Sequence, residues 1–186
     1  MIGFAMCGSF CTHKRSLEQM RRLRAEGYDI MPIMSENVYL TDTKFGKAED
    51  LKASVRDICG REIISTVVDA EPIGPRALLD VLVICPCTGN TLAKLAHGIT
   101  DTAVTMAAKA HLRSDGPLVI ALASNDALSA NLANIGTMLN KKNVYFVPMS
   151  QDDPQKKPHS LVAEFDLLLP TLDAALKGMQ YQKIFV

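Results

Sequence analysis

The segment with the clearest chemical content follows the most apolar run of the chain. Residues 86–91 read Pro-Cys-Thr-Gly-Asn-Thr and come directly after the run from Val81 to Cys85. They offer hydroxyls, an amide and free backbone N–H groups at the predicted start of a helix, a set that suits a polar, flat ligand with many acceptors, such as a ribityl chain or the edge of an isoalloxazine ring. An ordinary N-capped helix, with Thr88 or Asn90 as the cap, is the alternative.

A second segment of this kind follows the first apolar run. Residues 7–12 read Cys-Gly-Ser-Phe-Cys-Thr. Gly8 permits close backbone approach, Ser9 and Thr12 supply hydroxyls, and the following helix adds free N–H groups, which together can hold a phosphate. The pattern is neither Gly-x-Gly-x-x-Gly nor a Walker loop. A capped strand-to-helix turn is the alternative.

Two further polar segments follow predicted strands. Ser35 comes after the second strand, where a simple serine turn would also explain it, and Ser124-Asn-Asp126 comes after the fifth. Four polar strand ends are more than helix capping requires. They predict a site for a mononucleotide-sized cofactor or a phosphorylated ligand.

Strand and helix patterns alternate along the chain and must position these segments. We expect strands at 2–6, 28–34, 63–68, 81–85, 118–123 and 144–147, and helices at 16–26, 47–59, 128–139 and 161–176, the last kinked at Pro170. Residues 91–113 carry two helical stretches broken near Gly98, and Pro86 is expected to end its strand. Residues 35–46, 71–75 and 151–159 read as loops. The pattern predicts an α/β fold, a three-layer, doubly wound parallel sheet in one domain spanning 1–186, which binds its ligand outside the carboxyl ends of the strands.

Composition excludes several functional classes. The 186 residues carry 20 basic and 20 acidic side chains, so the formal net charge is zero, which argues against broad electrostatic binding to nucleic acid or membrane. No apolar run reaches the length of a membrane span and no secretory signal is expected. The five cysteines suit a reducing cytoplasm, and Cys85-x-Cys87 lacks a second ligand pair for zinc, so we expect no metal site. His97 reads as a packing or capping residue, and Cys87 as a small buried one.

The segments at the strand ends resemble a known family. Residues 86–91, followed by Ala93-Lys-Leu-Ala-His-Gly-Ile-Thr-Asp101, are similar to the Pro-x-x-x-Asn-Thr motif of the homo-oligomeric flavin-containing flavoproteins, which include peptidyl-cysteine decarboxylases and flavin prenyltransferases. Loop motifs at 41–46, 70–75, 124–128 and 153–160 resemble one branch of that family, the flavoprotein subunits of dipicolinate synthases. The resemblance implies a Rossmann-like flavoprotein fold, FMN bound where two copies of the chain meet, and a trimer or a multiple of it.

The resemblance also implies which residues bind the cofactor and which depart from the family. Ser35 matches a phosphate-binding serine, whereas Ser124 stands where flavin prenyltransferases have an FMN-binding arginine. Residues 71–75 contain no histidine where the cysteine decarboxylases carry their catalytic one, which argues against that decarboxylation. The expected cofactor-binding residues are Gly8, Ser9, Phe10, Thr12, Ser35, Pro86, Cys87, Thr88, Gly89, Asn90, Thr91 and Ser124.

The branch implies an oxidation that forms an aromatic ring. A dihydro or tetrahydro precursor would become dipicolinate, a pyridine dicarboxylate, with the help of a dehydrogenase-like A subunit in the mother-cell cytoplasm of a sporulating bacterium. A dianionic substrate needs cations and polar groups, for which we expect Arg76, Asn125, Lys156 and Lys157; His159, beside the lysines, is a weaker acid–base candidate. Two alternatives remain: another FMN-dependent enzyme of the family, and a partner protein without chemistry of its own.

Overall fold

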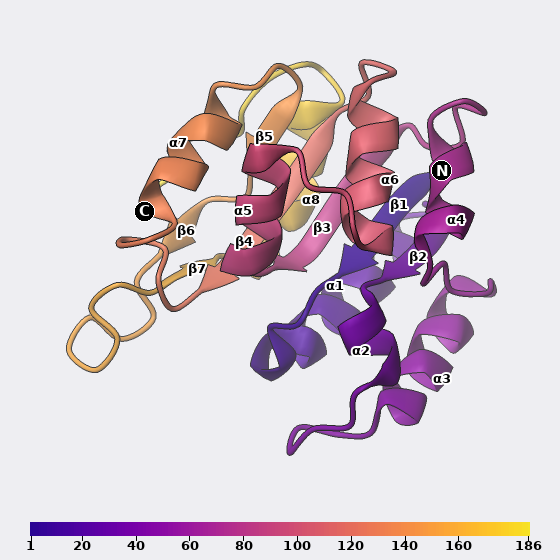
Figure 1. The fold of residues 1–186 in the computed structure, drawn as a ribbon, viewed down its shortest axis with the longest axis horizontal. Helices are drawn as coiled ribbons and strands as arrows, with labels where there is room; N and C mark the ends of the chain where they lie inside the picture. Colours follow the sequence, from indigo (N-terminus) through magenta and orange to yellow (C-terminus); the bar gives the residue numbers. More distant parts are fainter.

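Seven strands form one mostly parallel sheet in the computed structural model, which describes residues 1–186 (Figure 1). The parallel part has the order β2-β1-β3-β4-β5, in which β5 pairs with the first half of β4. Two short antiparallel strands, β6 and β7, continue the sheet from the last residues of β4. The strands are β1 (Ile2–Met6), β2 (Ile30–Met34), β3 (Val81–Cys87), β4 (Leu118–Ser124), β5 (Val144–Phe146), β6 (Met149–Ser150) and β7 (Leu161–Ala163).

Helices cover both faces of the sheet. One face packs against α5 (Gly89–His97), α6 (Ala103–Leu112) and α7 (Leu132–Leu139), and the other against α1 (His13–Ala25), α3 (Ala48–Cys59) and α8 (Leu168–Ala175). The shorter helices are α2 (Glu36–Leu40) and α4 (Val67–Ala70), and single 3₁₀ turns lie at Phe10–Thr12, Glu71–Ile73 and Phe165–Leu167. None of the helices combines the length and the apolar composition that a membrane span requires.

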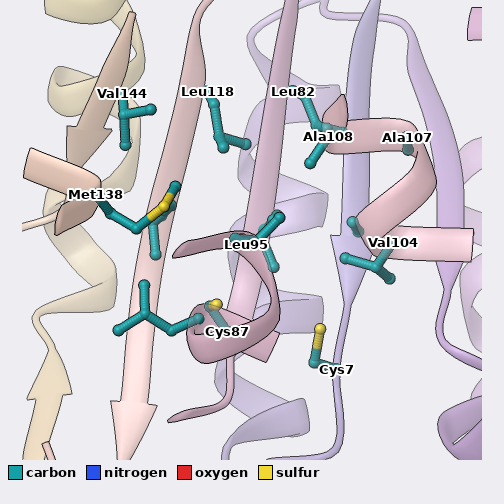
Figure 2. Close-up of a cluster of buried hydrophobic side chains, with 14 of the residues drawn as sticks. Cys7, Leu82, Cys87, Leu95, Val104, Ala107, Ala108, Leu118, Met138 and Val144 are labelled. Atoms are coloured by element: carbon teal, nitrogen blue, oxygen red, sulfur yellow. The ribbon is translucent and has the colours of Figure 1, made fainter. Parts of the chain in front are cut away.

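The alternation of side chains along each strand builds two separate cores. Leu82 and Ile84 of β3 belong to the cluster under α5 and α6, whereas Val81 and Val83 belong to the cluster under α1 and α8. Figure 2 shows the first cluster, in which Leu95 and Val104 of the covering helices meet side chains of β3 and β4. Both faces are buried, which explains why these strands read as continuous apolar runs.

The strand order creates a switch point between β1 and β3. The chain leaves β1 toward β2 on one side, and β3 lies on the other side of β1. Sheets with this order bind ligands in the crevice outside the carboxyl ends of the two strands at the switch. The loops that follow β1 and β3 carry two of the four polar segments predicted to form the site.

The predicted fold class is confirmed, and so are most of the elements. The strands at 2–6, 81–85, 118–123 and 144–147 are present within a residue or two, and the helical break falls at Gly98, whose φ is +72°. The helix predicted at 47–59 is α3. The sheet differs from a purely parallel one through β6 and β7.

Four local predictions are wrong. Residues 63–68 form no strand, because only Ile64 bridges to β2 and Thr66 then caps α4. Pro86 does not end its strand, since β3 continues to Cys87 with a register shift against β4. Residues 35–46 contain α2, which Ser35 caps.

The fourth wrong prediction is the helix at 161–176. This segment begins as strand β7, passes through a 3₁₀ turn and becomes helical only at Leu168. Pro170 therefore lies in the first turn of α8, where its missing N–H breaks no helical hydrogen bond and no kink is needed.

Candidate functional site

The loops after β1 and β3 are joined to each other at the switch point. The backbone N–H of Cys7 donates to the carbonyl oxygen of Pro86 over 3.1 Å, and the hydroxyl of Thr91 donates to the Cys7 sulfur over 3.3 Å. Cys7 and Cys87 lie beneath these loops, near the carboxyl ends of their strands (Figure 2). The structure therefore brings these two predicted polar segments into one place.

The β1 loop presents unused backbone donors. The N–H groups of Gly8 and Ser9 form no hydrogen bond within the chain, while the loop around them is fixed. Thr12 Oγ1 donates to the Ser9 carbonyl over 2.8 Å, and Nε2 of the buried His13 lies 2.8 Å from the Cys7 carbonyl oxygen and donates to it. Free N–H groups in a rigid turn beside a helix start form a binding site for anionic oxygens.

Burial decides the protonation of His13. It lowers the pKa of the imidazole below its ordinary value, although the hydrogen bond to the Cys7 carbonyl acts in the opposite sense. His13 is therefore neutral near pH 7 and serves as a structural donor under the loop, which leaves the positive potential of the site to the backbone.

The β3 loop leads into α5, where one side chain caps the helix and another is exposed. Thr88 caps the helix, since its hydroxyl accepts from the backbone N–H of Thr91 over 3.1 Å. Asn90 is exposed and its amide has no partner in the chain. The cap fixes the first turn of α5, and the amide of Asn90 is left available to a ligand.

Gly89 marks the tightest approach in the site. A Cβ at this position would lie 2.4 Å from Ser124 Oγ, 2.6 Å from Asn131 Nδ2 and 2.8 Å from Asp126 Oδ1. The end of β4 therefore packs directly on the start of α5, and only glycine fits between them. The residues after β3 and those after β4 meet here. The hydrogen bond from Thr91 to Cys7 connects the end of β1 to them, so three of the four predicted strand ends are joined.

Ser124 is engaged by its own loop. Its hydroxyl donates to Asp126 over 2.5 Å, and Asn131 donates to the other oxygen of that carboxylate over 2.9 Å. The bond from Ser124, followed by that from Asn131, holds the pKa of the Asp126 carboxyl below its usual value. Ser124 can still accept a hydrogen bond, and the neighbouring Asn125 is exposed.

Ser35 occupies the fourth strand end. Its backbone N–H donates to the Met6 carbonyl of β1, and its hydroxyl accepts from the N–H of Val38 over 3.4 Å as the cap of α2. The side chain is buried, beside the β1 loop. The carboxylate of Glu36 in turn accepts from the N–H of Ala103, which ties α2 to the start of α6.

The predicted substrate-binding cations lie in two different parts of the structure. Lys156 and Lys157 lie in the exposed loop between β6 and β7, where Lys157 pairs with Asp152 over 2.6 Å and has a raised pKa through that contact. Cys11 of the β1 loop adds a smaller electrostatic contribution to this rise in the pKa of Lys157, so the two loops lie near each other. Lys156 lies 3.9 Å from Asp153.

Arg76 is not brought to this edge. The turn that carries it packs on the last turn of α6, where a Cβ on Gly74 would meet the Ala110 carbonyl oxygen at 2.2 Å. Asp80, just before β3, donates its N–H to the Met1 carbonyl at the start of β1. Arg76 therefore lies at the amino ends of the strands, on the opposite edge of the sheet.

The buried thiols and the imidazoles carry no nucleophile into the site. Burial raises the pKa of Cys7 to about 11, that of Cys85 to about 12, and that of Cys87 well above its usual value. His97 lies in the last turn of α5, away from the crevice, and His159 is exposed. No group of three or more His, Cys, Asp or Glu side chains is arranged to hold a metal ion.

One cavity beside the site is not predicted by the sequence. It has a volume of about 480 Å³ and lies between the start of α1, α2, residues 41–47 and α3, with Phe10 and Cys11 in its wall. Lys14, Phe45 and Lys47 line it and were not among the candidate residues. Phe10, an expected cofactor-binding residue, and the loop motif at 41–46 are the features of the sequence that fall in this place.

Comparison with known proteins agrees with the fold. Residues 1–162 match the Flavoprotein family. The whole chain is 43% identical to the B subunit of dipicolinate synthase from Bacillus subtilis over 92% of that protein. It superposes on the crystal structure of the corresponding B subunit from Bacillus halodurans with a TM-score of 0.91 at 43% identity, covering 100% of this chain and 95% of the other. The FMN-dependent cysteine decarboxylase SpaF, at 23% identity, shares the fold alone, with a TM-score of 0.69 over 95% of this chain and 94% of its own.

Proposed function

The chain belongs to the flavoprotein family, in the group of the dipicolinate synthase B subunits, and from this premise we propose that it is an FMN-binding subunit that acts with a dehydrogenase-like A subunit to form dipicolinate. One observation carries the proposal. Polar segments after four parallel strands converge on the β1–β3 switch point, where two backbone N–H groups and an exposed amide have no partner in the chain. This is the place where sheets of this order hold a flavin mononucleotide.

The residues of the crevice fit FMN. The N–H groups of Gly8 and Ser9, with the hydroxyls of Ser9 and Ser35, can receive the phosphate without any arginine. The first turn of α5, from Thr88 to Thr91, offers N–H, hydroxyl and amide groups to the ribityl chain and the ring edge. A phosphate held in this way needs little net positive charge, in agreement with a chain whose formal charge is zero.

The chemistry proposed for the complex is an oxidation. A dihydro or tetrahydro dicarboxylate loses hydrogen and becomes an aromatic pyridine, and a bound flavin supplies the capacity to accept hydride equivalents from a ring carbon. The side chains of this chain orient the dianionic substrate and shield the crevice. Asn125 and the loop with Lys156 and Lys157 lie at this edge of the sheet and can contact carboxylates there.

Arg76 can serve such a site only from a neighbouring copy. It lies at the far edge of the sheet in its own chain, and its exposed guanidinium has no ion-pair partner. The proposal therefore includes a homo-oligomer, a trimer or a multiple of it, in which one copy completes the site of another.

Reconstitution with the A subunit tests the function. The purified chain is titrated with FMN and then mixed with the dehydrogenase-like subunit, with and without FMN, while dipicolinate formation is followed by its ultraviolet absorbance. Flavin binding together with FMN-dependent dipicolinate formation is the expected result. Full dipicolinate formation without FMN would identify a partner protein that lacks chemistry of its own.

Variants of the cofactor loop distinguish a flavin-binding subunit from a partner protein without chemistry of its own. Asn90→Asp places a negative charge beside the ring edge and Thr91→Val removes a hydroxyl, and both should weaken FMN binding. Asn140→Asp, at the exposed end of α7 and remote from the crevice, is the matched control for charge. If Asn90→Asp and Thr91→Val leave dipicolinate formation unchanged in an intact complex, the flavin role is wrong.

A further inference from the structure

The cavity between α1 and α3 shares a wall with the proposed cofactor site. Phe10 lines the cavity, and its ring lies against Gly8 of the β1 loop, 3.6 Å from the position of a Cβ there. Cys11, the next residue, also lines the cavity. One aromatic ring therefore separates the phosphate-binding loop from a space of about 480 Å³, which is the size of a small-molecule site.

The cavity wall opposite α1 is a preformed turn. Residues 41–47 form a closed turn, since Thr43 and Gly46 exchange two backbone hydrogen bonds of 3.0 and 3.1 Å. Asp42 accepts from the N–H of Ala48 over 2.8 Å and so fixes the turn to the start of α3. Phe45 at the tip is 58% exposed although it is a large apolar residue, and it lines the cavity.

The lining combines flat apolar surface with cations that have no partner. Phe10, Leu17, Phe45 and Leu51 supply the apolar part. Lys14 comes from α1 and Lys47 from the start of α3, and neither forms an ion pair within the chain, whereas the neighbouring Lys52 is paired with Glu49. Asp50 is the one acidic residue of the lining, so the two ammonium groups leave an excess of positive charge.

We propose that this cavity binds the pyridine dicarboxylate of the reaction, with its ring between Phe10 and Phe45 and its two carboxylates at Lys14 and Lys47. The inference rests on the proposed function for the identity of the ligand. A flat ring with an anionic group on either side matches apolar walls with an unpaired ammonium group on each of two elements. It assigns the dicarboxylate to residues of α1 and the 41–47 loop and not to the loop with Lys156 and Lys157, which does not line the cavity.

The exposed thiol of Cys11 provides a readout that requires neither FMN nor turnover. Cys11 lines the cavity, and the other four cysteines are buried. The rate at which a maleimide labels Cys11 is measured in the FMN-free chain at increasing dipicolinate concentrations. Saturable protection of Cys11 is expected, with succinate, which lacks the ring, protecting at least about tenfold more weakly.

Variants locate the binding site. Lys14→Ala, Lys47→Ala and Phe45→Ala should each weaken protection about tenfold or more, because each removes a charged or stacking contact. Lys177→Ala, an exposed lysine just after α8 that does not line the cavity, should leave the affinity unchanged. Absence of protection, or protection that all three cavity variants retain, would overturn the inference.

The proposed function and the assignment of the cavity can fail independently of each other. If dipicolinate does not protect Cys11 while the chain binds FMN and supports dipicolinate formation with the A subunit, only the assignment of this cavity is wrong. If dipicolinate binds the cavity but FMN neither binds nor changes product formation, the flavin role fails and the cavity remains a dicarboxylate site.

Discussion

Replacing Gly89 by alanine should damage the cofactor site and the fold together. The added Cβ would lie 2.4 Å from Ser124 Oγ, whereas an ordinary contact begins near 3.4 Å, so the hydroxyl has to retreat by about 1 Å. Ser124 cannot retreat alone, because it shares the carboxylate of Asp126 with Asn131, which is itself buried. The start of α5 and the end of β4 must therefore separate.

The size of the effect follows from the crowding and from helix propensity. Overpacking of this kind costs about 1–3 kcal/mol. Alanine recovers at most about 1 kcal/mol in the first turn of a helix compared with glycine. We therefore expect Gly89→Ala to lower the free energy of unfolding by about 1–2 kcal/mol, and FMN affinity to fall about tenfold, because the loop from Thr88 to Thr91 moves with the helix.

A matched glycine in α7 provides the control. Gly136 is exposed and a Cβ there meets nothing within 4 Å, so Gly136→Ala should stabilise the chain by about 0.5–1 kcal/mol and leave FMN binding unchanged. Urea unfolding of the FMN-free protein gives the stabilities, and quenching of flavin fluorescence gives the affinities. A Gly89→Ala variant as stable as the wild type, with the same FMN affinity, would show that the packing at this position is not as tight as described.

Three further predictions concern the cofactor loop and the titratable groups. Asn90→Asp should weaken FMN binding about tenfold without changing the midpoint of urea unfolding, because Asn90 is exposed and unpartnered; an unchanged affinity would argue against an amide contact to the ring. Burial lowers the pKa values of His13 and of His111, a buried residue in the last turn of α6, below the ordinary 6.5. The unfolded chain therefore binds protons more readily, and the free energy of unfolding should fall as the pH drops below about 6.5. Urea unfolding should show a smaller pH dependence in the double variant His13→Gln/His111→Gln, and an equal pH dependence would contradict the assignment. A thiol reagent near neutral pH should modify one cysteine rapidly in the native FMN-free chain, Cys11, and all five after denaturation; rapid reaction of two or more would show that the crevice opens.

The sequence predicts the sheet well because its strands are buried on both faces. The run from Val81 to Cys85 and the run from Leu118 to Ala123 have no polar residue, and each belongs to the parallel centre of the sheet. The placement of the polar strand ends follows from the same pattern, since the residues after parallel strands meet at one edge whatever the helices do. This is why the four polar strand ends could be brought together without a structure.

The failures come from segments whose conformation is decided by tertiary contacts. Residues 63–68 have strand composition, but only Ile64 finds a partner, and Val68 remains 78% exposed. Arg76 lies in a loop, and a loop at the amino ends of strands cannot be distinguished by composition from one at the carboxyl ends. The cavity with Lys14 and Phe45 combines a helix face with a loop tip and therefore has no periodic signature.

The edge of the sheet at β2 has a consequence for assembly and for folding. Pro32 in the middle of β2 has no N–H, its carbonyl already accepts from Ile64, and the N–H of Met34 donates to the Ile64 carbonyl. The outer side of β2 thus retains few groups that could pair with a foreign strand, and a single bridging residue blocks its end. Strand addition by another molecule is therefore disfavoured at this edge, and the most apolar strands inside the sheet stay protected from aggregation there.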